Sequence, residues 1–155
     1  NLFISFGSTL LIKSLILLPI IIFIVGLFIV NRPEKLTDIL WEAKNYDAFF
    51  INEGQFFDDL YEAVNYLVNM ENKKVYVCGL DGDFQRREFG SILKIIPLCD
   101  DVVKLKAICK SCKICDGIFT FRLSNEKEQM LIGTDNYTAL CRNCYNLRKN
   151  PEQNV

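Results

Sequence analysis

The hydrophobic and polar positions divide the chain into an almost wholly apolar beginning and a longer part with mixed patterning. From Leu2 to Val30 the only charged residue is Lys13; the uncharged core, residues 15–30, has 16 positions, and residues 10–30 give 21 if Lys13 and Ser14 are included. A membrane-spanning helix needs about 20 such residues. The pattern therefore predicts a transmembrane or membrane-lying helix within residues 1–31. The alternative is that this segment is not native coding sequence, because the composition changes abruptly at Asn31.

Beyond Pro33 the spacing of the apolar residues predicts alternating helices and strands. An amphipathic helix follows Pro33, and a buried strand is predicted at 48–51. A second helix begins at Asp58 and Asp59, whose negative charges suit the positive end of the helix dipole. A second strand is predicted at 75–80, and strands joined by a helical crossover of this length run parallel. The apolar stripes of the two helices are Leu36, Ile39, Leu40 and Ala43, and Leu60, Ala63, Val64, Leu67 and Val68.

The rest of the chain carries shorter periodic segments. Gly90–Ile96 is predicted as a short helix ended by Pro97, and Val102–Ile108 as a third strand. Further on, Phe119–Leu123 and Gln129–Ile132 have strand character, which predicts a hairpin between them.

Two acidic residues follow the predicted parallel strands. Glu53 comes just after the strand at 48–51, and Asp81 follows the strand at 75–80. Ligands of open α/β sheets bind beyond the carboxyl ends of the strands, where a carboxylate can take a proton from a substrate hydroxyl. The alternative for Glu53 is an ordinary acidic loop residue after a core strand. The nearby Phe84 and Phe89 could stack on a planar ligand, but the residues alone favour a core role.

Four of the seven cysteines have the spacing of a metal site. Cys109-x-x-Cys112 and Cys141-x-x-Cys144 are separated by 28 residues, which predicts a closed, structural zinc site of four thiolates. The alternative is a pair of disulfides, which requires an oxidising compartment. Spacing alone leaves Cys115 ambiguous, because Cys112-x-x-Cys115 is also an acceptable knuckle. The chain has no histidine, which excludes Ser/His/Asp and Cys/His catalysis.

The charge balance gives no support for nucleic-acid binding. The 155 residues carry a formal net charge of -1, with no basic stripe. Gly7–Ser14 has the spacing of a phosphate-binding loop, but Ile12 replaces the second glycine. A β-branched residue resists the backbone geometry that such a loop needs, so we treat this likeness as coincidence.

Four motifs in order resemble those of cellular and viral type II thymidine kinases. The resemblance covers about residues 33–148. The motifs are Ile51-Asn52-Glu53-Gly54-Gln55-Phe56-Phe57, Leu80-Asp81-Gly82-Asp83-Phe84-Gln85-Arg86, Val102-Val103-Lys104-Leu105-Lys106-Ala107-Ile108-Cys109 and Cys141-Arg142-Asn143-Cys144-Tyr145. The fold that the resemblance implies is α/β, a partial P-loop-type parallel sheet with flanking helices and a small C-terminal zinc-ribbon lobe.

The resemblance also implies a domain plan. Residues 1–31 form the apolar segment, 32–107 the C-terminal part of the α/β kinase domain, 108–147 the zinc-ribbon lobe and 148–155 a tail. The implied activity is ATP-dependent phosphorylation of the 5′-hydroxyl of thymidine, by a cytoplasmic homotetramer.

The resemblance assigns roles to individual residues. Glu53 is the implied general base, and the stretch Asn52, Glu53, Gly54 and Gln55 borders the phosphates of ATP with Mg²⁺. Residues implied to contact the thymine base are Phe56, Leu80, Phe84 and Thr120, the loop of Gln129, Met130, Leu131, Ile132 and Gly133, and Tyr137, which closes over the substrate. Cys109, Cys112, Cys141 and Cys144 are the implied structural zinc ligands, which leaves Cys115 outside the set.

Two departures from the family pattern bear on activity. No intact glycine-rich phosphate loop precedes Glu53, and Asn52 stands where the family has an aspartate that holds magnesium. We therefore expect this chain not to catalyse on its own, and an upstream exon to encode the missing loop. The alternative function is a membrane-tethered, non-enzymatic zinc-binding remnant of a kinase.

Overall fold

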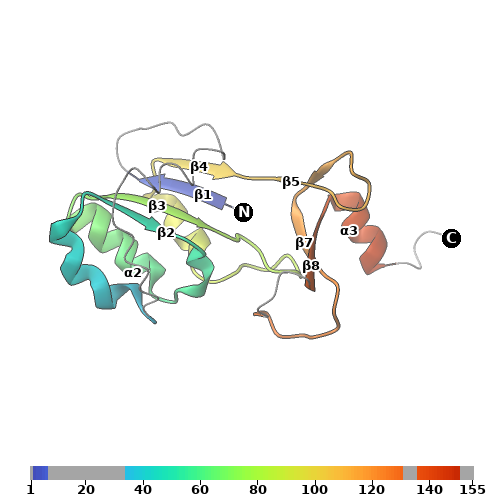
Figure 1. Cartoon of the computed structure of the whole chain (residues 1–155), viewed down its shortest axis with the longest axis horizontal. Helices are drawn as coiled ribbons and strands as arrows, with labels where there is room; N and C mark the ends of the chain where they lie inside the picture. Colours follow the sequence, from blue (N-terminus) through green and yellow to red (C-terminus); the bar gives the residue numbers. More distant parts are fainter. Residues whose placement is uncertain (1, 7–33, 131–135, 151–155) are drawn as a thin grey trace.

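The computed structural model describes residues 2–6, 34–130 and 136–150, and its larger part is built on a four-stranded sheet (Figure 1). The strands are β1 (Leu2–Phe6), β2 (Ala48–Ile51), β3 (Lys74–Gly79) and β4 (Asp101–Lys104), in the order β2-β3-β1-β4. Strands β2 and β3 are parallel, with Ala48 opposite Lys74 and Ile51 opposite Val77, which confirms that prediction. Strand β1 is antiparallel to both β3 and β4.

The placement of β1 was not predicted from the apolar pattern. Its five residues are extended and fill the gap between β3 and β4, outside any helix. The remainder of the predicted membrane helix and the phosphate-loop lookalike lie outside the described residues. Within the described ranges, none of the helices combines the length and the hydrophobicity needed to span a bilayer.

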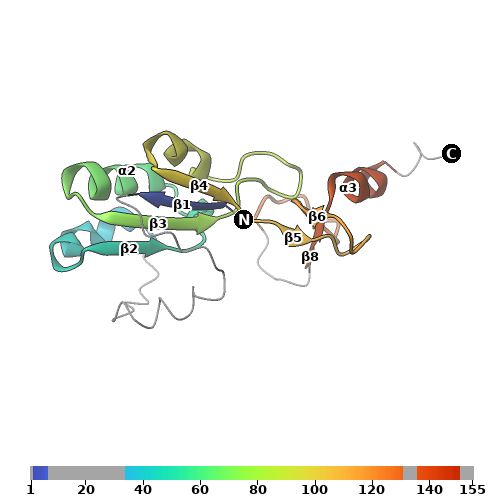
Figure 2. The ribbon, with the colours of Figure 1, turned by 90° about the horizontal axis from the view of Figure 1, so that it is seen from above.

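Three helical segments cover one face of the sheet (Figure 2). They are η1 (Leu36–Asn45), α2 (Leu60–Asn65), which continues as the wider turn η3 (Tyr66–Met70), and η4 (Ile92–Leu98). On β3, Val75 and Val77 are fully buried against these helices, whereas Tyr76 points to the other face and stacks on Phe50. Alternation along the strand therefore produces a core on one side. Pro97 lies inside η4, so the prediction that this helix ends before Pro97 is wrong.

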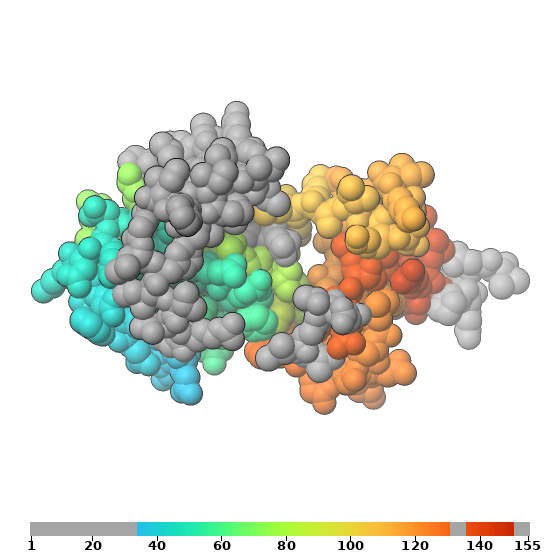
Figure 3. All heavy atoms as spheres, viewed as in Figure 1, coloured from blue at the N-terminus to red at the C-terminus, as the bar shows by residue number. Residues whose placement is uncertain are grey.

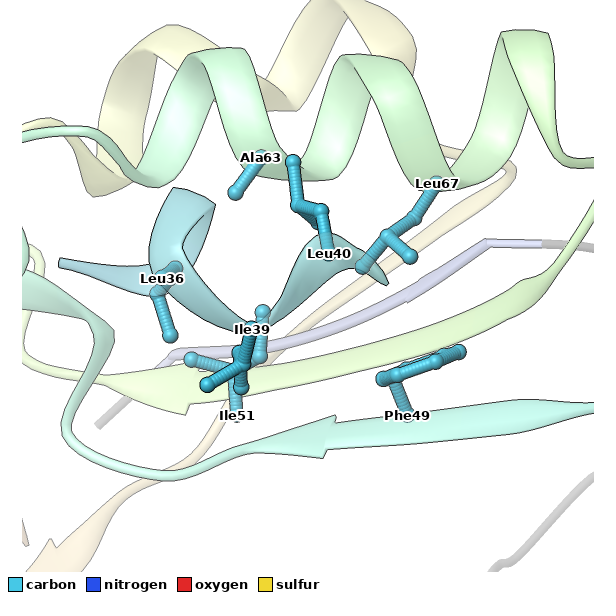
Figure 4. Close-up of a pocket in the computed structure, with 7 residues that line it drawn as sticks. All are labelled: Leu36, Ile39, Leu40, Phe49, Ile51, Ala63 and Leu67. Atoms are coloured by element: carbon cyan, nitrogen blue, oxygen red, sulfur yellow. The ribbon is translucent and has the colours of Figure 1, made fainter. Parts of the chain in front are cut away.

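A small apolar cavity of about 20 Å³ lies within this core, between η1, β2 and α2 (Figure 4). A cavity of this size holds about one water molecule. It is lined by Leu36, Ile39, Leu40, Phe49, Ile51, Ala63 and Leu67. Its wall contains no polar side chain, so we attribute it to imperfect packing in the core.

The C-terminal lobe contains two small antiparallel sheets and a helix. Strand β5 (Ala107–Ile108) pairs with β6 (Asp116–Gly117), β7 (Phe119–Arg122) pairs with β8 (Tyr137–Leu140), and α3 (Arg142–Lys149) follows. Figure 3 shows the atoms of this lobe, orange to red, gathered at one end of the molecule. Its own core consists of Cys109, Leu140, Cys141 and Tyr145, packed against Cys112, Phe119, Phe121 and Cys144.

Two strand predictions in this region are wrong. The segment predicted as one strand, Val102–Ile108, is split into β4 and β5, which belong to different sheets. The partner of β7 is β8, because Gln129 and Met130 lie outside any strand. Leu131 and Ile132 lie outside the described residues.

Candidate functional site

The turn after β2 places Glu53 at the edge of the sheet. Glu53 is exposed and has a left-handed backbone with φ of 54°, immediately before the short helix η2 (Gly54–Phe56). Position 54 requires glycine, because a Cβ there would lie 2.8 Å from Val77 Cγ1. This close approach of η2 to β3 fixes the direction in which the turn leaves the strand.

Gln55 joins this turn to the one after β3. Its side chain is buried, Nε2 lies 2.6 Å from Glu53 Oε2, and Oε1 accepts the backbone N–H of Leu80 at 3.0 Å. Because the Leu80 N–H can only donate, the carboxamide must turn its NH₂ group toward Glu53. Gln55 therefore holds the Glu53 carboxylate as a hydrogen-bond acceptor at the mouth of the two parallel strands.

The neighbouring polar groups at this edge already have partners. The thiol of Cys78 donates to Asn52 Oδ1 at 2.9 Å, and burial raises the pKa of that thiol. Lys104 on β4 forms an ion pair with Asp81. Asp81 and Glu53 thus both follow parallel strands, as predicted, but among the described residues only Asp81 is neutralised by a lysine.

Asp83 is a buried carboxylate that joins the two parts of the molecule. It accepts the backbone N–H groups of Gln85 and Arg87 at 2.8 and 2.9 Å and pairs with the Arg87 guanidinium at 2.8 Å. From the C-terminal lobe, Gln129 Nε2 donates to Asp83 Oδ2 at 2.9 Å and to the carbonyl of Glu88 at 3.1 Å. Burial acts to raise the pKa of Asp83, but these hydrogen bonds outweigh it and lower the pKa.

Arg122 lies at the centre of the polar contacts in the C-terminal lobe. It is buried at the end of β7, and its guanidinium carbon lies 3.8 Å from the centroid of the Phe84 ring. Its NH groups donate to the carbonyls of Glu126, Glu128 and Gln129. It also donates to the Tyr137 hydroxyl at 2.6 Å.

The predicted base-binding residues have different environments. Phe56 is 43% exposed and meets Phe89 edge to face at 5.6 Å, while Phe89 is buried, in line with the core role that the residues favoured. Phe84 and Leu80 are half-buried. Thr120 shares a face of β7 with Arg122, since side chains two positions apart point the same way. Met130 is exposed, and Leu131, Ile132 and Gly133 lie outside the described residues.

These contacts join several of the predicted residues in two groups, one at the edge of the four-stranded sheet and one at the C-terminal lobe. Gln55 links Glu53 to Leu80, Phe84 is covered by Arg122, and Arg122 contacts Tyr137. Arg122 and Asp83 were not predicted as site residues. The signal for Arg122 was a lone charge within the apolar strand Phe119–Leu123, and for Asp83 it was a second acid two residues after Asp81.

The four predicted cysteine ligands converge in the C-terminal lobe. The sulfur atoms of Cys109, Cys112, Cys141 and Cys144 all lie within 4.8 Å of one another. Four thiolates about 2.3 Å from a central zinc ion are about 3.8 Å apart, so this cluster has the size of a tetrahedral zinc site. Cys115 is exposed and lies outside the cluster, although its carbonyl accepts the N–H of Cys109.

Backbone N–H groups surround the sulfur atoms of the cluster. The N–H of Cys144 points at Cys141 Sγ at 3.4 Å, and the N–H of Cys115 points at Cys112 Sγ at 3.5 Å. Burial acts to raise the pKa of Cys109, but hydrogen bonds from the backbone outweigh it and lower the pKa to about 6. Such donors favour the thiolate form that binds metal.

Comparison with known proteins identifies the family. The thymidine kinase family model matches residues 28–145. The cytosolic thymidine kinase of Gallus gallus is 44% identical over 124 residues, which cover 79% of this chain and 54% of that protein. The cytosolic thymidine kinase of Homo sapiens is 44% identical over 111 residues, 71% of this chain and 47% of that protein. The thymidine kinase of vaccinia virus (strain Ankara) is 44% identical over 112 residues, 72% of this chain and 62% of that protein.

The chain thus spans about half to three-fifths of the length of these relatives. The family match nevertheless covers the sheet edge with Glu53, the Asp83 and Arg122 contacts and all four clustered cysteines. The chain belongs to the type II thymidine kinase family.

Proposed function

We propose that this chain supplies the nucleoside-binding side of a kinase that transfers the γ-phosphoryl group of ATP to the 5′-hydroxyl of thymidine. Family membership supports this activity, since the relatives are named thymidine kinases. The observation that carries the proposal is the Glu53 carboxylate, held by Gln55 at the mouth of two parallel strands.

Glu53 would act as the general base. Gln55 donates a hydrogen bond to its Oε2, which leaves the second carboxylate oxygen free for the substrate. That carboxylate oxygen would accept the proton of the 5′-hydroxyl while the hydroxyl oxygen attacks the γ-phosphorus of ATP. The left-handed turn at Glu53 presents the carboxylate to solvent at the sheet edge, where a bound nucleoside could reach it. Because Gln55 is itself fixed by the N–H of Leu80, the carboxylate would be oriented before the substrate binds.

The base would lie between aromatic and backbone groups. Phe56, Leu80 and Phe84 would pack against the ring of thymine, and Thr120 and Tyr137 would border it from the C-terminal lobe. Backbone groups of residues 129–133 would hydrogen-bond the edge of the base. An apolar wall combined with a few fixed polar groups is the usual composition of such a pocket.

ATP would bind with its phosphates near residues 52–55. When bound, ATP with Mg²⁺ supplies the phosphoryl group and a cation that balances its charge. Asn52 is a poor magnesium ligand, because its amide oxygen is neutral and already accepts the Cys78 thiol. We therefore assign magnesium to no residue of this chain.

Zinc would be held by Cys109, Cys112, Cys141 and Cys144. Four protein ligands leave no open position for water, so zinc would stabilise the lobe and take no part in the reaction. The lobe has a small core built around these same cysteines, and it would depend on the metal for its fold. We further propose a cytosolic location, because two of the relatives are named cytosolic thymidine kinases. We also propose a homotetrameric assembly and no nucleic-acid partner.

The test is thymidine binding and turnover by the wild-type chain and by E53Q. E53Q should bind thymidine within about twofold of wild type, because only the charge and basicity of the carboxylate change. Turnover, measured in a chimera that adds the N-terminal half of a relative, should fall by about a hundredfold or more. E62Q is the matched control, since Glu62 is exposed on α2 and should leave both quantities unchanged.

The outcomes separate the alternatives. Binding without turnover in the wild-type chain would place the missing contribution at the phosphate end, and a chimera with the N-terminal half of a relative should then restore turnover. A wild-type chain and a chimera that both fail to bind thymidine would favour the non-enzymatic alternative.

A further inference from the structure

The position of Arg122 on strand β7 determines where its guanidinium lies. On β7, Phe119 and Phe121 point toward Tyr145, at centroid distances of 5.4 and 5.6 Å. Alternation sends Arg122 to the opposite face, where its side chain becomes buried against the ring of Phe84. A strand with two aromatic anchors on one face thus holds a cation on the other.

The hydrogen bonds of Arg122 wrap a loop of the chain around this cation. Nη1 donates to the carbonyls of Glu126, at 3.0 Å, and Glu128, and Nη2 donates to the carbonyl of Gln129 at 3.2 Å. Nη2 also lies 2.6 Å from the Tyr137 hydroxyl oxygen, which accepts because a guanidinium can only donate. One side chain therefore fixes a turn between β7 and β8 and the first residue of β8.

The charge of Arg122 is balanced in an unusual way. In the ranges that the structure describes, no carboxylate forms an ion pair with it, and its Nε is buried without a hydrogen-bond partner. Three carbonyl dipoles, a hydroxyl and the face of Phe84 surround it instead. Burying a cation that forms no direct ion pair costs stability, although the charge of Glu126 lies near enough to interact with it. The orientation of its hydrogen-bond acceptors therefore explains an arginine here better than a gain in stability does.

We infer that Arg122 is the positioning residue of the base-binding pocket, an inference that rests on the proposed thymidine kinase function. Three parts of that pocket meet at its guanidinium, namely Phe84, the loop that carries Gln129, and Tyr137. The side chain of Gln129 fastens the same loop to Asp83, so the loop is held from both lobes. Only a planar fork with five donors can hold these acceptors and stack on a ring at once, which a lysine cannot do.

The test measures thymidine affinity by titration calorimetry on the full chain loaded with zinc. R122Q should weaken thymidine binding by about tenfold or more, and R122K, which keeps the charge and loses the fork, should recover only part of this loss. R148Q is the matched control, because Arg148 lies over Phe121 of the same strand, is exposed and has no hydrogen bond to a loop carbonyl among the described residues. Its affinity should stay within about twofold of wild type.

A second measurement reports the loop itself. Trypsin cleavage after Lys127, which lies between the carbonyls that Arg122 binds, should be slow in wild type and slower still with thymidine. R122Q should be cut faster, and thymidine should no longer protect it, while its zinc content stays equal to that of wild type. If R122Q does not fold, R122K carries the same test with the charge retained.

The outcomes distinguish this inference from the proposed function. A wild-type chain and a chimera that both bind no thymidine overturn both. A wild-type chain that binds thymidine, together with R122Q and R122K variants of unchanged affinity and unchanged cleavage, overturns only the role of Arg122. If R148Q and R122Q weaken thymidine binding equally, the role of Arg122 is also overturned, since the effect would then arise from the net charge of the lobe.

Discussion

The side-chain amide of Gln55 donates to Glu53 at 2.6 Å, and this pairing ties the proposed base to the backbone of the neighbouring strand through Leu80. We predict that Q55L lowers turnover strongly and lowers the free energy of unfolding by about 1–3 kcal/mol, because the buried N–H of Leu80 loses its acceptor. Urea unfolding of the chain and a thymidine phosphorylation assay of the chimera with the N-terminal half of a relative measure the two effects. Q85L, which changes an exposed side chain, should leave both near wild type. A stable but inactive Q55L would mean that Gln55 only orients Glu53.

Gly90 should tolerate no side chain. Its φ is +61°, and a Cβ there would lie 2.2 Å from the carbonyl oxygen of Gln55, a contact that neither backbone can relieve without moving. We predict that G90A lowers the free energy of unfolding by about 2 kcal/mol or more and shifts Gln55, which lowers turnover as well. The control is G82A, where the nearest atom to a new Cβ is the Arg87 carbonyl oxygen at 3.5 Å. Equal stability of G90A and wild type in chemical unfolding would contradict this packing.

Protonation of Asp59 should make the α/β part less stable in acid. Its carboxylate accepts the N–H groups of Leu36 and Thr37 and the Thr37 hydroxyl, which fastens the start of η1 to the start of α2. Burial acts to raise the pKa of Asp59, but these hydrogen bonds outweigh it and lower the pKa below its ordinary 3.8. A lowered folded-state pKa means that the stabilisation is present above about pH 4 and is lost as pH falls through the folded-state value.

We therefore predict that D59N is less stable than wild type at neutral pH, by about 1 kcal/mol, and that the difference shrinks below about pH 4. Unfolding by urea at a series of pH values measures this difference. D58N is the matched control, since Asp58 is adjacent and exposed, and any general effect of acid on the metal site appears in both variants. A difference between D59N and D58N that stays constant with pH would refute the linkage.

The sequence predicted best the segments whose period and length are set locally. The strands at 48–51 and 75–80 and the intervening helix follow from apolar runs and an i, i+3, i+4 stripe, and their parallel pairing follows from the crossover. The cysteine cluster was equally predictable, because two short knuckles bring their own ligands close.

The wrong predictions lie where contacts between residues distant in the sequence determine the local structure. Gln129 begins no strand as predicted, because Arg122 donates hydrogen bonds to the carbonyls of Glu126, Glu128 and Gln129, in place of a neighbouring strand. The break between β4 and β5 at Leu105 and Lys106 marks the passage of the chain from one sheet to another, which alternation along a single segment does not reveal. Whether a lone arginine in an apolar strand is buried likewise depends on acceptors that only the fold supplies.

Cys112 and Cys115 offer a direct test of the metal site, because Cys112-x-x-Cys115 also has the spacing of a zinc knuckle. Cys112 lies in the four-sulfur cluster, whereas Cys115 is exposed and lies outside it. We predict that wild type and C115S bind zinc with equal affinity, and that C112S binds it at least about tenfold more weakly, measured by competition with a chromophoric chelator.

Removal of zinc should unfold the C-terminal lobe selectively. The lobe has a core made largely of the zinc-binding cysteines with Leu140 and Tyr145, whereas the α/β part has a separate apolar core. Chelation should therefore abolish thymidine binding, because Gln129, Arg122 and Tyr137 all belong to this lobe, and should leave a cooperative unfolding transition for the rest. Loss of both transitions together would show that the contacts of Gln129 with Asp83 and of Tyr145 with the Phe84 carbonyl couple the two parts into one cooperative unit.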